Sequence, residues 1–148
     1  MKNKIFLLFL GLVTFSCKDS LTDPNLESIN GAKAKWKSAN ITSYTLDQAR
    51  FCNCLDSDVF VRISVTNNII VDVTDTLGVE RIPTNMWSNY KTVDQLFDII
   101  YDVRNRNVSQ LQMDFNEQYG YPTMIAVNPS DMVIGDEYGY TCQKLTRR

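Results

Sequence analysis

The chain has 148 residues and no histidine, and its 15 basic and 17 acidic residues give it a net charge of −2. This length predicts one domain, and the absence of histidine removes the usual general base, the commonest transition-metal ligand and the physiological pH switch. The basic residues are scattered along the sequence, whereas nucleic-acid binding needs clustered lysine and arginine, so the composition argues against nucleic acid as a partner.

The start of the chain has the pattern of an export signal. Two lysines precede the apolar run 5–13, which is too short to span a bilayer, and small Ser16 stands directly before Cys17. We therefore expect residues 1–16 to be a signal peptide that is removed in front of Cys17. An ordinary secretory signal cut nearby would instead leave Cys17 as a free thiol.

Cys17 also resembles the acylated cysteine of bacterial lipoproteins, which becomes the new N-terminus after cleavage. Thr14 and Phe15 replace the leucine and the small residue that usually stand before this cysteine, a relaxation common in lipoproteins of the Bacteroidota. Lys18-Asp19 resembles the short tag that sends such lipoproteins to the cell surface. The resemblance implies a lipid anchor on Cys17 and an outer-membrane lipoprotein, and the tag favours the cell surface without fixing the leaflet.

We predict a tether between this anchor and the folded domain. Residues 17–28 are polar, contain Pro24 and have no apolar period, so they are expected to be flexible. A single domain then spans residues 29–148 and begins with a short helix over residues 29–39. The apolar residues that recur on one face of this helix are Ile29, Ala32 and Trp36.

Three strands are predicted next. Residues 44–54 have apolar side chains at even spacing, and residues 59–66 alternate apolar and mostly polar side chains most clearly of all. Asn67-Asn68 supplies two residues that tolerate positive φ, and β-branched residues resume over 69–74. We therefore expect a tight hairpin between the second and third strands.

The register of this hairpin has two solutions. A strict two-residue loop places Asp72 opposite Ile63 on the apolar face of the sheet. One additional loop residue, as in a bulged turn, aligns Val73 with Ile63 and Val71 with Val65. We predict the bulged register, because it keeps valine rather than aspartate on the buried face.

A long connection then leads to the most regular helix of the sequence. Residues 75–91 have little periodicity and could hide a short strand over residues 79–82. Thr92 and Gln95 match a capping box, in which the threonine hydroxyl satisfies a first-turn amide and the glutamine reaches back to the cap. The apolar residues that follow at helical spacing are Val93, Leu96, Phe97, Ile100 and Val103.

Three further strands complete the predicted fold. Apolar and polar residues alternate over 110–116, residues 121–127 form the next strand, and residues 137–145 form the last one. Strands joined by tight turns, with no alternating strand–helix units, favour an antiparallel arrangement. The predicted fold is α+β: a single domain with one antiparallel sheet of about six strands, a short N-terminal helix and the capped helix packed across the sheet.

The order of several motifs resembles one family of secreted lipoproteins. The more specific motifs are the capped segment 92–97 and the turn 120–123, while Asn67-Asn68 stands where the family usually has Asp-Gly. The other shared features are Trp36, Tyr44 and Cys52-Asn53-Cys54. The chain is similar to the proteins grouped as domain of unknown function 6174 (DUF6174) over nearly its whole mature length. This resemblance implies a fold and a compartment but no reaction.

Three cysteines are disulfide candidates, because an exported protein meets an oxidising compartment. Cys52 and Cys54 on an extended strand sit too far apart for easy closure, so we predict one disulfide joining Cys142 to either of them. A local turn would instead pair Cys52 with Cys54 and leave Cys142 free, and the family resemblance also hints at this pairing. The nearby donors make a poor metal set without histidine, so we expect no metal and no cofactor.

Acidic pairs and aromatic residues are the remaining functional candidates. The carboxylates that could do acid and base work are Asp56 and Asp58, Asp114 and Glu117, and Asp136 and Glu137. The aromatic residues that could form a binding surface are Trp87, Tyr90, Tyr119 and Tyr121. We predict a non-enzymatic lipoprotein of the outer membrane that binds an envelope protein or a glycan. The alternative is a small secreted hydrolase that uses acidic residues.

Overall fold

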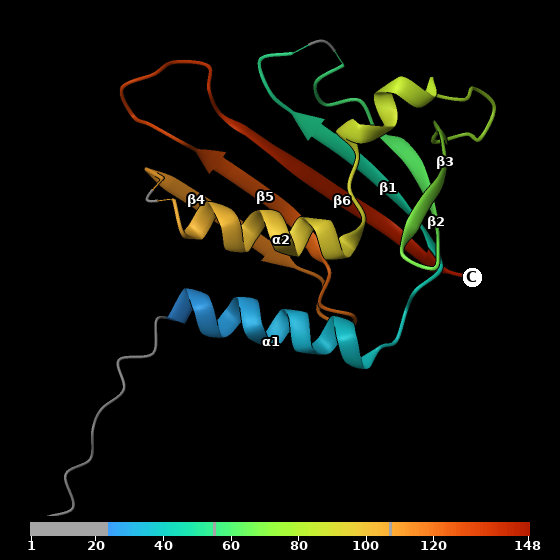
Figure 1. The fold of residues 1–148 in the computed structure, drawn as a ribbon, viewed down its shortest axis with the longest axis horizontal. Coiled ribbons are helices and arrows are strands. Elements are labelled where there is room, and N and C mark those ends of the chain that lie inside the picture. The colour runs from blue at the N-terminus through green and yellow to red at the C-terminus, as the bar shows by residue number, and fades with distance from the viewer. Residues whose placement is uncertain (1–23, 55, 107) are drawn as a thin grey trace, which may run out of the picture.

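The structure of the chain is a computed structural model that describes residues 24–54, 56–106 and 108–148. Within these residues the strands form one antiparallel sheet in the order β3-β2-β1-β6-β5-β4, with two α-helices against it (Figure 1). The elements are α1 (Pro24–Ser38), β1 (Tyr44–Phe51), β2 (Val61–Thr66), β3 (Ile69–Asp75), the 3-10 helix η1 (Thr84–Asn89), α2 (Val93–Arg104), β4 (Gln110–Phe115), β5 (Pro122–Asn128) and β6 (Tyr138–Arg147). The predicted α+β fold is confirmed. The predicted signal peptide and Cys17 lie outside the described residues.

Helix α2 packs across the sheet, as predicted. All five apolar residues of its predicted face are buried: Val93, Leu96, Phe97, Ile100 and Val103. The capping box is present, because the Gln95 amide donates to the Thr92 hydroxyl at 3.3 Å and the Thr92 amide donates to the Gln95 side chain at 2.9 Å. The Phe97 ring stacks on Phe115 of β4 with centroids 6.0 Å apart. The helix is therefore fixed at its start and against the sheet.

Helix α1 begins earlier than predicted, at Pro24 rather than near residue 29. Proline is tolerated in the first turn of a helix, because the amide it lacks has no helical partner there. The predicted face is confirmed, since Ile29, Ala32 and Trp36 are buried. Residues 24–28, predicted as part of the tether, are helical. Their mostly polar sequence has no apolar period from which this first helical turn could be predicted.

The ends of the first strands and the connection after them differ from the prediction. β1 ends at Phe51 rather than near residue 54, and β2 begins at Val61 rather than at Val59. Within the predicted strand 79–82, Arg81 forms an isolated bridge with Thr74 of β3. The 3-10 helix η1, which has no period long enough to detect in the sequence, then leads to α2.

The hairpin between β2 and β3 has a bulge, but at a different place from the predicted one. The two turn asparagines have positive φ, 50° and 63°, and form a strict two-residue turn. Ile63 faces Val73 as predicted, whereas Val65 faces Ile70 rather than Val71. The additional residue is therefore Val71, inside β3, because a pair of asparagines already satisfies the geometry of a tight turn.

The two ends of the sheet are built differently (Figure 1). At one end, which we call the turn end, short turns join β2 to β3 and β4 to β5. At the opposite end, which we call the loop end, three longer connections leave the strands: residues 52–60, 76–83 and 129–137. Figure 1 shows the loop end at the top of the view and the turn end at the bottom.

Gly120 fixes the turn end against α1. Its φ of +77° lies in the left-handed region, and a Cβ at this position would be 2.3 Å from the carbonyl oxygen of Ala32. Lys35 of α1 also donates a hydrogen bond to the carbonyl of Glu117 at 2.7 Å. The β4–β5 turn therefore needs glycine both for its backbone conformation and for the close approach of α1.

Candidate binding surface

The predicted disulfide to Cys142 is wrong. Cys52 and Cys54 are bridged, with their Cα atoms 5.2 Å apart, and Cys142 is free and buried. β1 ends before Cys52, and the Cys54 amide donates to the Cys52 carbonyl at 2.8 Å, so both cysteines lie in a tight local turn instead of an extended strand. The alternative with a local turn is the one that the structure shows.

Cys142 is held in the core as a protonated thiol. Gln48 Nε2 lies 3.5 Å from its Sγ atom. Burial raises the pKa of the Cys142 thiol from 9.0 to about 12, and the hydrogen bond from Gln48 offsets part of this rise. Only the thiolate is a good nucleophile. Cys142 is therefore a packing residue and not a reactive one.

The four aromatic residues predicted as a binding surface do not form one. Tyr121 is a core residue, 5 % exposed, so the prediction is wrong for this ring. Tyr90 is only 4 % exposed, but it lines a hollow together with Trp87. Trp87 and Tyr119 are half-buried and lie apart. Trp87 belongs to η1 beside β3, whereas Tyr119 lies in the β4–β5 turn with the Arg147 guanidinium 5.4 Å from the centroid of its ring. A ring in a short connection can turn back into the core, and both buried tyrosines do so.

The space beside Trp87 is a groove between β3, η1 and the start of α2. It has a volume of about 420 Å³, and we call it the Trp87 groove. The lining residues that matter for recognition are Ile69, Ile70, Trp87, Ser88, Lys91 and Gln95. Ile69 is 65 % exposed, so the groove offers an apolar side chain to solvent at its rim.

Two sets of hydrogen bonds hold the wall of the Trp87 groove. The Trp87 indole N–H donates to the carbonyl of Ile82 at 2.9 Å. Gln48, fully buried on β1, accepts a hydrogen bond from the Lys91 amide at 2.8 Å and donates one to the Lys91 carbonyl at 3.0 Å. Gln48 is not among the predicted site residues, although a polar residue at an inward-facing strand position is a usable sequence signal.

Lys91 places a cationic group at the rim of this groove. Its ammonium donates to the carbonyl of Ser88. Burial lowers the pKa of Lys91, and the nearby charge of Arg50 lowers it further. The groove thus combines aliphatic and indole walls with an ammonium and an amide at the edge. This lining suits an apolar side chain with polar neighbours.

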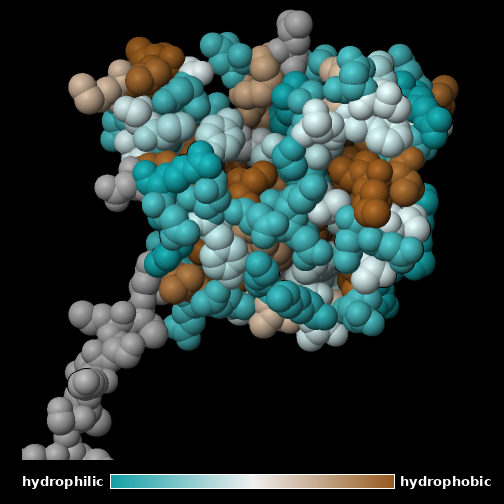
Figure 2. Space-filling model, viewed as in Figure 1, coloured by the Kyte–Doolittle hydropathy of each residue, from teal (hydrophilic) through white to brown (hydrophobic). Residues whose placement is uncertain are grey.

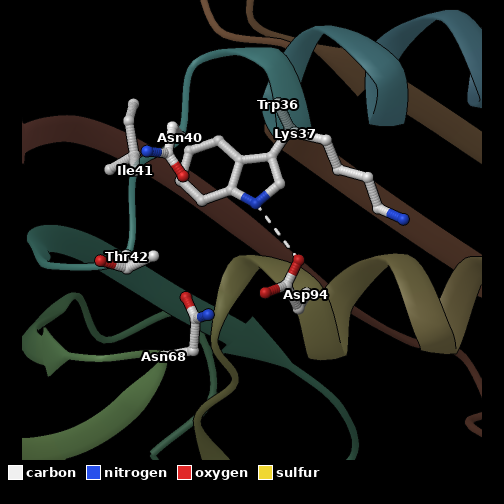
Figure 3. A pocket seen from close by; sticks show the side chains of 7 residues that line it. All are labelled: Trp36, Lys37, Asn40, Ile41, Thr42, Asn68 and Asp94. Carbon is white, nitrogen blue, oxygen red and sulfur yellow. Dashed lines mark hydrogen bonds between the residues drawn. The ribbon is translucent and has the colours of Figure 1, made fainter.

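A second hollow lies on the other side of the β2–β3 turn, beside the end of α1 (Figure 3). It measures about 190 Å³ and shares Asn68 with the Trp87 groove. Trp36 donates its indole N–H to Asp94 at 3.2 Å, and its ring is only 3 % exposed. The Val93 amide at the start of α2 already donates to the Tyr44 hydroxyl at 2.9 Å. These groups tie α1 and β1 to α2, which is a structural role.

The carboxylates considered for hydrolysis are mostly solvated surface groups. Asp56, Asp58, Asp114, Glu117 and Glu137 are exposed, and Asp136 is half-buried. Asp47 is fully buried, but Arg62 binds both of its oxygens, at 2.7 and 3.0 Å. In the part of the chain that the structure describes, no three His, Cys, Asp or Glu residues lie close enough together to hold a metal ion.

Comparison with known proteins agrees with the motifs of the sequence. The model of a family described as a family of unknown function (DUF6174) matches residues 28–147, from α1 to the end of β6. No curated protein and no solved structure matches the chain. Because the family match covers most of the chain, the protein belongs to the DUF6174 family.

Proposed function

We propose that this protein is a lipid-anchored binding module of the bacterial cell envelope that works by contact and not by catalysis. The apolar segment that ends at Cys17 supports a lipid anchor at the outer membrane. Among the described residues, no helix is both long and apolar enough to cross a membrane. The ligand is an envelope protein or, as the alternative, an envelope glycan.

The Trp87 groove is the observation that carries this proposal. Its indole is held by Ile82, and Gln48 clamps the backbone behind it, so these walls lose little freedom when a ligand binds. The exposed side chain of Ile69 would gain from being covered, since fully burying such a side chain is worth about 1.5–3 kcal/mol. Aliphatic walls beside an indole suit an apolar side chain of a protein better than the hydroxyl groups of a glycan, so a protein is the better-supported ligand.

The hydrolase alternative receives no support from the positions of its carboxylates. A carboxyl group acts as a general acid near neutral pH when desolvation or a neighbouring carboxylate raises its pKa. The acidic pairs of this chain lie largely on exposed turns, and the buried carboxylate of Asp47 is occupied by Arg62. Contact is therefore the better-supported function.

Capture from native envelopes tests the Trp87 groove. Tagged full-length protein is extracted in mild detergent from the cells that produce it, and bound proteins are quantified for the wild type, Ile69→Asp and Val71→Asp. Val71 is also exposed on β3 but lies outside the groove lining, so it is the matched control. We expect Ile69→Asp to lower capture about tenfold, equivalent to about 1.4 kcal/mol, and Val71→Asp to leave it unchanged. Equal capture by all three proteins would contradict a role for the groove.

The lipid anchor is tested separately by Cys17→Ser. We expect the wild type to partition into the detergent phase and the variant into the aqueous phase, because the acyl chains are lost. If the variant still partitions with the membranes, the proposed anchor is wrong.

A further inference from the structure

Large apolar side chains project from the loop end. Most of the strongly exposed hydrophobic residues of the described chain belong to its three connections. They are between 52 % and 99 % exposed: Val59, Leu77, Val79, Met132, Val133 and Ile134. Side chains so exposed contribute little to the core, and gathered apolar surface on a soluble domain marks an interaction site.

The three connections leave the same end of the sheet, and two of them are in contact. β2 and β3 are neighbours in the sheet, so connections 52–60 and 76–83 leave adjacent strand ends. A Cβ on Gly135 would lie 3.3 Å from the side chain of Asn53, which places connection 129–137 against connection 52–60. Figure 2 shows apolar surface projecting at the upper left and at the upper right edge, where Figure 1 places connections 129–137 and 76–83.

The three connections also carry carboxylates. The acidic residues of the three connections are Asp56, Asp58, Glu80, Asp131, Asp136 and Glu137. The basic residue among them, Arg81, is bound to Asp72 of β3 at 2.7 Å. One carboxylate oxygen of Asp136 is buried and accepts no hydrogen bond from the described residues. The three connections therefore combine exposed apolar side chains with an excess of carboxylates.

We propose that the loop end is a docking surface for a second protein that presents an apolar patch ringed by lysine and arginine. Apolar burial supplies the affinity, and the carboxylates attract the partner and select its charge. The same carboxylates disfavour two other occupants, because an anionic lipid surface repels them and a second copy docked loop end to loop end brings like charges together. This inference goes beyond the proposed function, since it uses no residue of the Trp87 groove.

Site-specific photo-crosslinking in intact cells tests this surface. A benzophenone-bearing amino acid is placed in the full-length protein at Leu77 or Ile134, and at Val71 as an exposed control outside both surfaces. We expect positions 77 and 134 to give the same adduct with one second protein, and position 71 to give none above background. Mass spectrometry should place the crosslink beside lysine or arginine residues of that protein.

A charge-reversed variant tests the chemistry of the contact. Asp131→Lys with Glu137→Lys should lower the yield of the adduct from Ile134 about tenfold, because it replaces attraction by repulsion. Thermal unfolding of the purified variant controls for loss of the fold. Both substitutions lie in connection 129–137, away from the sheet pairing. Among the described residues they remove only two exposed hydrogen bonds, from Asn128 to Asp131 and from the Gly135 amide to Glu137, so we expect the unfolding temperature to fall only slightly.

Every other outcome overturns the proposal. Adducts with lipid alone would identify a membrane contact, and adducts with a second copy would identify self-association. An adduct that also forms from position 71, or that survives charge reversal, would show contact without the proposed complementarity. No adduct from positions 77 and 134 would show that the surface is unoccupied in the cell. Because Ile69→Asp reports on the groove alone, failure of the groove and failure of the loop end are distinguishable.

Discussion

The turn end and the loop end of the sheet differ in what determines them. Both ends contain residues with positive φ, but only at the turn end, at Gly120, would a Cβ meet the backbone of a helix, 2.3 Å from the Ala32 carbonyl oxygen. At the loop end, longer connections project side chains such as Met132 and Ile134 into solvent. The turn end is therefore specified by the requirements of folding, whereas the loop end carries side chains that folding does not need.

The two ends also differ in charge. At the turn end, Lys37 and Asp94 line one hollow and Arg147 and Arg148 line its neighbour. The three long connections of the loop end are mainly acidic. An uneven electrostatic field of this kind attracts partners of different charge to the two ends of the molecule. The loop end is the one that favours a cationic partner.

The largest expected effect comes from Gly120→Ala at the turn end, compared with Gly78→Ala at the loop end. Both glycines have positive φ, +77° and +75°, but only the first would place its new Cβ against α1, 2.3 Å from the Ala32 carbonyl oxygen. The left-handed conformation costs each variant about 1–2 kcal/mol. Displacing α1 should cost Gly120→Ala about a further 1–3 kcal/mol. Urea unfolding measures both, and equal losses would contradict the role of the α1 contact.

The second effect concerns the sheet between the two ends. Arg62→Ala removes two hydrogen bonds from the buried carboxylate of Asp47 and leaves Lys144, 3.9 Å away, as a weak substitute. Because Arg62 is itself partly exposed, we expect a loss of about 2–3 kcal/mol, below the range for a fully buried pair. The control is Arg81→Ala, whose pair with Asp72 is exposed. Urea unfolding should show a much smaller loss for the control, and similar losses would contradict the importance of burial.

The third effect is a loss of stability at alkaline pH. Because the pKa of the Cys142 thiol is raised from 9.0 to about 12, the folded state keeps a proton that the unfolded chain releases. The free energy of unfolding is therefore unaffected by this group below pH 9 and falls above it by about 1.4 kcal/mol per pH unit. Burial also raises the pKa of Tyr44, which acts in the same direction at higher pH.

Cys142→Ala isolates the contribution of the thiol. Urea unfolding between about pH 8 and pH 10 should show a shallower fall in stability for the variant than for the wild type. Alkylation of the native protein supplies a second measure, because the buried thiol should react only after unfolding. Rapid alkylation of native Cys142, or an identical pH slope in both proteins, would show that solvent reaches the thiol.

The sequence predicts those parts of the fold whose signals lie within a few residues. In helix α2, Thr92 marks the first turn and the helical period of apolar residues marks the buried face. In the strands, apolar and polar residues alternate. The sequence does not distinguish a local turn at Cys52 and Cys54 from an extended strand, because the same residues permit both backbone geometries. The bulge at Val71 depends on pairing with β2, which a single strand does not reveal.

The candidate surfaces were harder to predict, because burial within a connection depends on residues far along the chain. Trp87 and Tyr90 lie in the same connection, yet one is half-exposed and the other is core. Gln48 acts on the backbone of Lys91, which is distant in sequence. Ile134 has the hydropathy of a core residue and is almost fully exposed. Hydropathy alone therefore separates neither surface from the core.

The claim that the loop end serves contact and not folding is tested most directly by the unfolding free energy of one variant. This variant carries Leu77→Ser, Val79→Ser, Met132→Ser and Ile134→Ser, all at side chains that are 83 % exposed or more. We expect its unfolding free energy to lie within about 1 kcal/mol of the wild type, because no core volume is lost. A loss of about 3 kcal/mol or more, as in truncating a buried leucine or isoleucine, would place these side chains in the core and contradict the claim.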